Sequence, residues 1–282
     1  MWIKYASPVV ILLAAAFTGQ GQYYYKDIVV TGQICTNYRV LKANKVSTVA
    51  VLPSEAGGGD GRDGINIDQT LFAQQNLLVT HTKTPDATES WLKSYYNDKG
   101  LLVKTTDSSV NVMTVSTYQY NTAGQLTSIS STAVSKDNPA ETEVHQWSYN
   151  ANGKPTRMLK VKDNYDTTFV TFEADEQGNA AEEKAVRKKG NLGTTYYYYD
   201  AKNQLTDVAR YNKKADRVLP NYMFEYNEAG QVTQMIIVPE GSSDYQTWKY
   251  LYDQQGLKQQ DLCYSKQKQL LGKIIYQYQF GK

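Results

Sequence analysis

The sequence predicts an all-β protein in which tandem antiparallel β-hairpin repeats form an elongated or curled meander sheet. Two observations carry this prediction: a five-residue turn element recurs along the chain, and the segments before each turn alternate between aromatic and polar residues. Composition agrees, because the 282 residues include 24 tyrosines but only 6 phenylalanines and 7 prolines. Tyrosine favours strands, since its ring packs on a pleated surface while its hydroxyl stays in water.

The turn element consists of an aromatic residue, Asn or Asp, two variable residues and Gly. Its copies are Tyr96 to Gly100, Tyr120 to Gly124, Tyr149 to Gly153, Tyr199 to Asn203, Tyr226 to Gly230 and Tyr252 to Gly256, with a degenerate copy at Ala174 to Gly178 and weaker ones at Phe72 to Asn76 and Val40 to Asn44. From residue 76 to residue 256 the fifth positions are 24 to 29 residues apart. Asn or Asp initiates a turn by bonding its own backbone, and Gly or Asn leaves it with positive φ. Each element is therefore predicted to be a hairpin turn with a left-handed exit residue.

The strand before each turn carries an aromatic ladder on one face. Period-two alternation places aromatic residues on that face and mainly polar residues on the other. The candidate binding residues come from this ladder: Trp147, Tyr149, Trp248, Tyr250 and Tyr252. The ladder is expected to be core, because an exposed stripe of this length would exceed ordinary apolar patches; the alternative is that part of it stacks on sugar rings or on a partner. In the outgoing strands, aliphatic residues three positions apart indicate a bulge.

The repeat resembles the YD (tyrosine-aspartate) repeat of Rhs- and teneurin-type proteins, in which hairpins wind into a long β-sheet. The resemblance rests on the pattern aromatic-x-Tyr-Asn/Asp-x-x-Gly-x-Leu over residues 90–280, and it is weaker over residues 38–90. The Arg that often follows the Gly in that family is absent here, as Gln125 and Gln231 illustrate. The resemblance implies an extracellular β-repeat protein, such as a small surface or adhesion module, and does not imply toxin delivery.

The first 21 residues are typical of a signal peptide. Lys4 precedes an apolar run from Val9 to Phe17, and small residues follow at Gly19 and Gly21. The run is too short to span a bilayer, so cleavage is expected rather than retention as an anchor. The chain is therefore predicted to be exported to the periplasm, the cell surface or the extracellular medium.

The rest of the chain divides into three predicted parts: an N-terminal hairpin over residues 22–52, a Gly/Asp-rich loop over residues 53–68 and the repeat array over residues 69–282. The loop matches one copy of a nine-residue calcium repeat, with Asp60, Asp63, Asn66 and Asp68 as candidate oxygen ligands. That motif binds calcium between stacked copies, so a single copy favours a plain loop, and no metal or cofactor is predicted.

No catalytic constellation is visible, and an enzyme is not predicted. His81 and His145 have no Cys or His at ligand spacing, and phosphate loops and nucleophile motifs are missing from the sequence. A formal net charge of +2 gives no basic surface for nucleic acid. Cys35 and Cys263 are far apart in an open sheet, so two separate thiols are expected, and a disulfide would require the array to close or fold back.

The function expected from the sequence is non-catalytic binding of a cell-envelope component, a glycan or a partner protein. Two alternatives stay open. One is an outer-membrane β-barrel, which the signal peptide, the strand count, the Tyr richness and the aromatic C-terminal strand favour. The other is a secreted hydrolase with a site that no motif marks. Free edge strands at both ends of an open array also predict self-association.

Overall fold

The computed structural model describes residues 23–56, 64–188 and 190–281. The predicted signal peptide lies outside the described residues, as do the candidate ligands Asp60 and Asp63. None of the helices in these ranges is long and apolar enough to cross a membrane.

The described residues form one α-helix, one 3-10 turn and 18 strands. The elements are α1 (Lys26–Ala43), β1 (Val46–Glu55), β2 (Asn66–Phe72), η3 (Ala73–Gln75), β3 (Leu77–Lys83), β4 (Glu89–Tyr96), β5 (Leu102–Ser108), β6 (Val112–Tyr120), β7 (Leu126–Ser135), β8 (Glu141–Tyr149), β9 (Pro155–Lys162), β10 (Asp166–Ala174), β11 (Ala180–Arg187), β12 (Gly190–Tyr199), β13 (Leu205–Asn212), β14 (Arg217–Tyr226), β15 (Val232–Ile237), β16 (Gln246–Tyr252), β17 (Lys258–Ser265) and β18 (Leu270–Phe280). Asn66 and Asp68 of the single calcium-like copy are strand residues of β2.

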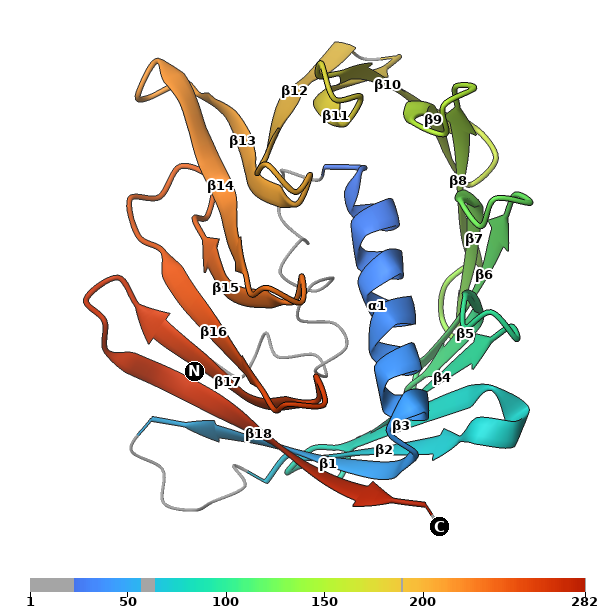
Figure 1. Ribbon diagram of the computed structural model, residues 1–282. Coiled ribbons are helices and arrows are strands. Elements are labelled where there is room, and N and C mark those ends of the chain that lie inside the picture. The colour runs from blue at the N-terminus through green and yellow to red at the C-terminus, as the bar shows by residue number, and fades with distance from the viewer. Residues whose placement is uncertain (1–22, 57–63, 189, 282) are drawn as a thin grey trace.

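The 18 strands close into an antiparallel β-barrel (Figure 1). Sequential strands are neighbours throughout, and β1 pairs both with β2 and with β18, which joins the two ends of the meander. The all-β hairpin meander is confirmed, but the predicted elongated or curled sheet is wrong in that its ends meet. Closure removes the free edges from which self-association was predicted; self-association itself stays a prediction.

The hairpin turns have the predicted construction. In the turn after β6, the Asn121 side chain accepts the Gln125 N–H at 2.9 Å, and Gly124 has φ 80°. Asn203, which replaces Gly in its copy, has φ 59°. The bulge is confirmed as well: Gln119 pairs with Ser128 and Tyr120 pairs with Leu126, so the outgoing strand carries one extra residue.

The prediction of a β-hairpin over residues 22–52 is wrong, because α1 occupies most of this segment and lies inside the barrel (Figure 1). The buried helix residues Thr31, Cys35, Tyr38 and Leu41 recur at steps of four and three, which is helical spacing. Both cysteines are buried and free. The helix is buried on one face only, because Gly32, Thr36, Arg39 and Ala43 are exposed and recur at steps of four and three on a separate face.

The aromatic ladder faces inward and builds the core together with α1. Tyr38 is completely buried and stacks on Tyr96 of β4 with ring centroids 3.7 Å apart. In six repeats the last ladder tyrosine also donates its hydroxyl to the carbonyl of the first residue of the preceding outgoing strand; the pairs are Tyr120 to Leu102, Tyr149 to Leu126, Tyr199 to Ala180, Tyr226 to Leu205, Tyr252 to Val232 and Tyr278 to Lys258. Each hairpin is thereby bonded to the one before it, which explains why the repeat uses Tyr rather than Phe.

Candidate functional site

The five predicted binding residues lie on the inward faces of β8 and β16. The rings of Trp147 and Trp248 are each 5% exposed, and Trp147 stacks on Phe172 at 5.3 Å. The Tyr149 and Tyr252 hydroxyls are engaged by neighbouring carbonyls. These rings therefore make core contacts in this structure, and ligand binding by them stays a prediction.

The histidine on the inward face, His145, belongs to a chain of charges at the start of α1. Its Nδ1 lies 2.6 Å from Asp27 Oδ2 and its Nε2 lies 2.9 Å from Glu143 Oε1, while Lys160 contacts the other Glu143 oxygen at 2.6 Å. Burial alone would lower the pKa of His145, but the carboxylates of Asp27 and Glu143 outweigh it and raise the pKa to about 9. Burial would likewise raise the pKa of Glu143, yet His145 and Lys160 hold it at about 2.

A second inward carboxylate, Glu183, anchors the segment before α1. It accepts the backbone N–H groups of Tyr24 and Tyr25 at 2.8 and 2.9 Å and the Tyr197 hydroxyl at 2.6 Å. Burial raises the pKa of Glu183, while these hydrogen bonds act in the opposite direction. Both clusters fix the helix inside the barrel. In the described ranges, no group of three His, Cys, Asp or Glu residues is arranged to hold a metal ion.

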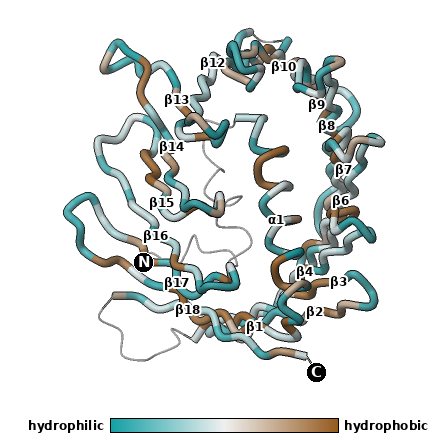
Figure 2. The backbone as a smooth tube through the Cα atoms, in the orientation of Figure 1, coloured by the Kyte–Doolittle hydropathy of each residue, from teal (hydrophilic) through white to brown (hydrophobic). Residues whose placement is uncertain are grey.

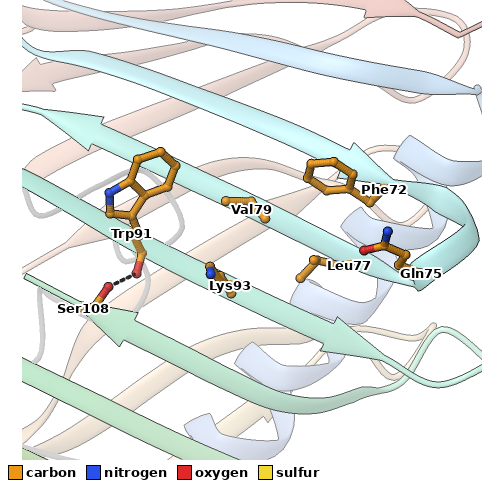
Figure 3. Close-up of a pocket in the computed structure, with 7 residues that line it drawn as sticks. All are labelled: Phe72, Gln75, Leu77, Val79, Trp91, Lys93 and Ser108. Carbon is orange, nitrogen blue, oxygen red and sulfur yellow. Dashed lines mark hydrogen bonds between the residues drawn. The ribbon is translucent and has the colours of Figure 1, made fainter.

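The outer wall carries a shallow groove over β2 to β5 (Figure 3). Its lining consists of Phe72, Gln75, Leu77, Val79, Trp91, Lys93 and Ser108. Strand alternation explains why these side chains meet: Ser94 and Tyr96 of β4 are buried on the inward face, so Trp91 and Lys93 point outward. Figure 3 shows Trp91 at one end of the groove, Phe72 and Gln75 at the other, and Leu77, Val79 and Lys93 between them.

Cross-strand neighbours fix the Trp91 ring. Trp91 pairs with His81 of β3 on one side, and the two rings stack with centroids 3.9 Å apart and planes 14° apart. On its other side Trp91 pairs with Ser108 of β5, a small residue whose hydroxyl bonds the Trp91 carbonyl. The Trp91 ring therefore packs against His81 on one face, and the residue remains 40% exposed.

The groove combines an aromatic surface with hydrogen-bonding groups. Lys93 forms no ion pair within the described residues, and Gln75 and Ser108 supply an amide and a hydroxyl. The lining includes no carboxylate, thiol or histidine.

The sequence analysis missed this groove, although one signal pointed to it. Trp91 lies five positions before Tyr96, an odd number, and therefore falls on the opposite face of β4 from the ladder: Ser94 and Tyr96 share one face, and Trp91, Lys93 and Tyr95 share the other. An aromatic residue off the ladder face is expected to be exposed; Trp91 and Tyr95 both have this position in β4, and Trp91 is the more exposed of the two. Phe72 had no comparable signal, because it stands in a weak copy of the turn element.

No protein-family model and no curated protein matches the sequence. Among solved structures, the chain is similar to TcdB2-TccC3 (14% identity, 78% of this chain and 13% of that chain, TM-score 0.35) and to the Photorhabdus luminescens Tc holotoxin pore (14%, 78% and 13%, TM-score 0.34). It is also similar to a porin-like protein from Bacteroides uniformis (12% identity, 84% of this chain and 97% of that chain, TM-score 0.34). The chain thus spans about 13% of the length of the first two. Values this low transfer no function, and membership of the YD-repeat family is not shown.

Proposed function

We propose that the protein is an exported, non-catalytic β-barrel that works in water and binds a cell-envelope component, a glycan or a partner protein through its outer wall. The placement of the aromatic residues carries this proposal. The ladder is packed against α1, whereas Trp91 and Phe72 of the outer groove are 40% and 43% exposed. Large apolar residues exposed side by side on neighbouring strands are typical of a recognition surface, and other exposed residues of the outer wall, such as Phe169, Tyr198 and Leu251, lie outside this groove.

The outer wall also carries charges partway along its strands. Lys93 of β4, Lys184 of β11, Lys249 of β16 and Lys273 of β18 alternate with inward-facing neighbours and therefore point outward. Figure 2 shows hydrophilic residues on strands all around the barrel. A lysine on the lipid face of a membrane barrel costs about 2–4 kcal/mol at the bilayer midplane. Four such residues favour an aqueous environment for this wall.

The second candidate is an outer-membrane β-barrel, and the closure of 18 antiparallel strands favours it. A membrane barrel requires a closed sheet, and the pairing of β1 with β18 closes this one, whereas the sequence predicts an elongated or curled meander. The two candidates differ in the surroundings of the outer wall, so the same experiment tests both.

The test is purification of the exported protein without detergent, followed by flotation with liposomes of bacterial lipid. The proposed function predicts a soluble monomer or small oligomer with strand-rich circular dichroism that stays at the bottom of the gradient. Recovery only in detergent, or flotation with strands protected from protease, would replace it with the outer-membrane barrel. Lys249→Leu with Lys273→Leu serves as a matched variant: flotation gained only by this variant shows that the charges keep the wall out of the bilayer.

A further inference from the structure

We propose that the outer groove binds an acidic saccharide, with a sugar ring stacked on Trp91 and its carboxylate paired with Lys93. This inference rests on the proposed function and names the ligand class of the groove. The face of an indole ring carries partial negative charge and attracts the weakly positive C–H groups of a sugar ring. Trp91 is 40% exposed, and its cross-strand neighbour on β5 is the small residue Ser108, which also lines the groove.

The Trp91 ring packs against His81 in the protein without a ligand. The Trp91 and His81 rings stack with centroids 3.9 Å apart, and His81 Nε2 lies 3.3 Å from Glu89 Oε2. Glu89 also contacts Lys83 at 3.4 Å. A ring held in one orientation loses little conformational freedom on binding, which favours affinity.

The charges around the groove select an anion. Lys93 lies in the middle of the lining and has no ion-pair partner in the part of the chain that the structure describes. A second outward lysine, Lys104, lies on the neighbouring strand with its ammonium 5.8 Å from the Tyr95 ring. Two carboxylates on this wall have other partners: Glu89, two residues before Trp91 on the same face, lies within 3.4 Å of His81 and Lys83, and Asp68 pairs across the strands with His81. A carboxylate on the ligand would therefore meet a cation without an opposing acid.

Closure of the sheet favours a saccharide over an extended peptide. A peptide gains most of its affinity for a β-protein by adding a strand at a free edge. Each strand of the described barrel has a partner on both sides, so this groove offers a peptide side-chain contacts alone. A saccharide needs no strand pairing: it needs a ring face, hydrogen-bonding groups such as Gln75 and Ser108, and a cation for its acid group.

The experiment is titration calorimetry with the purified protein and a panel of acidic oligosaccharides: tetragalacturonate, a mannuronate tetramer, a hyaluronan hexasaccharide and sialyllactose. Methyl-esterified tetragalacturonate and lactose are the neutral counterparts. We expect at least one acidic member to bind at least about tenfold more tightly than its neutral counterpart, and to weaken with added salt. Trp91→Ala and Lys93→Gln should each weaken binding at least about tenfold, while Lys93→Arg should retain it.

Control variants lie on the outer wall away from the groove. Tyr198→Ala removes an aromatic residue that is 50% exposed, and Lys249→Gln removes an outward charge; both should leave binding unchanged. Folding of each variant is checked by circular dichroism. Failure of all four acidic probes to bind the folded barrel would overturn the inference, as would binding that both groove variants leave intact. In the latter case the proposed function survives with a different surface, whereas partition of the protein into liposomes would overturn both.

Discussion

Replacing Trp248 should destabilise the barrel and leave the outer groove intact. Trp248 of β16 is 5% exposed, and its cross-strand partners are Met235 and Cys263, which are 3% and 0% exposed. Truncation of a buried Trp to Ala costs about 3–5 kcal/mol, because transfer free energy is lost and a cavity remains. Total stabilities of single domains are about 5–15 kcal/mol, so this loss is large.

The assay is urea unfolding followed by far-ultraviolet circular dichroism, with Trp91→Ala as the matched control. Trp91 is already 40% exposed and loses mainly its stacking on His81, for which we expect about 1 kcal/mol or less. Should Trp248→Ala prove too unstable to fold, Trp248→Phe gives a smaller loss that is measurable. A free energy of unfolding within about 1 kcal/mol of the wild type for Trp248→Ala, at unchanged m-value, would refute the assignment of the ladder to the core.

Three further predictions concern the helix anchor, the ladder hydroxyls and the turns. The pKa of His145 is raised from 6.5 to about 9, so its ion pairs contribute fully below pH 6.5 and are lost as pH rises through about 9; chemical denaturation across that range should show the decline, and His145→Gln should flatten it. Tyr120→Phe should cost about 1 kcal/mol in urea unfolding, because a carbonyl loses its donor, whereas Tyr198→Phe at an exposed position should cost nearly nothing, and equal losses would contradict a role for the hydroxyl. Gly230→Ala should lower stability by about 1–2 kcal/mol, because φ is 78° and the added Cβ would lie 3.1 Å from the Gln204 amide, while Asn203→Gly should be nearly neutral; thermal melts that rank them the other way would count against the left-handed exit.

The local parts of the fold could be predicted because their causes are local. The turn depends on Asn121 and Gly124. Their hydrogen bonds within the turn reach no further than Gln125, four positions after Asn121. The bulge follows from the spacing of aliphatic residues in one strand. These interactions recur in each copy, so one pattern predicts seven hairpins.

The sequence predicts that the aromatic ladder is either core or a partly exposed binding surface. Closure of the sheet decides between the two, because it turns the ladder inward. In an open sheet the ladder could face a partner; in the barrel it faces α1. Closure joins β1 to β18, and contacts such as Ser47 to Gln279 span 232 positions in the chain. Such pairing has no local signature, because β1 and β18 would look the same as edge strands of an open array.

Helix and closure depend on each other physically. A barrel of this many strands has a wide lumen, which in porins is a water channel. A single sheet cannot build a dry core alone, since each apolar face needs a second layer. The N-terminal segment contributes to that layer: Cys35, Tyr38 and Leu41 of α1 belong to the same buried cluster as ladder residues such as Tyr96 and Tyr197 and as aliphatic strand residues such as Leu102 and Val208. The outer wall is then not required as a core layer, and large residues such as Trp91, Phe169 and Tyr198 stay exposed on it.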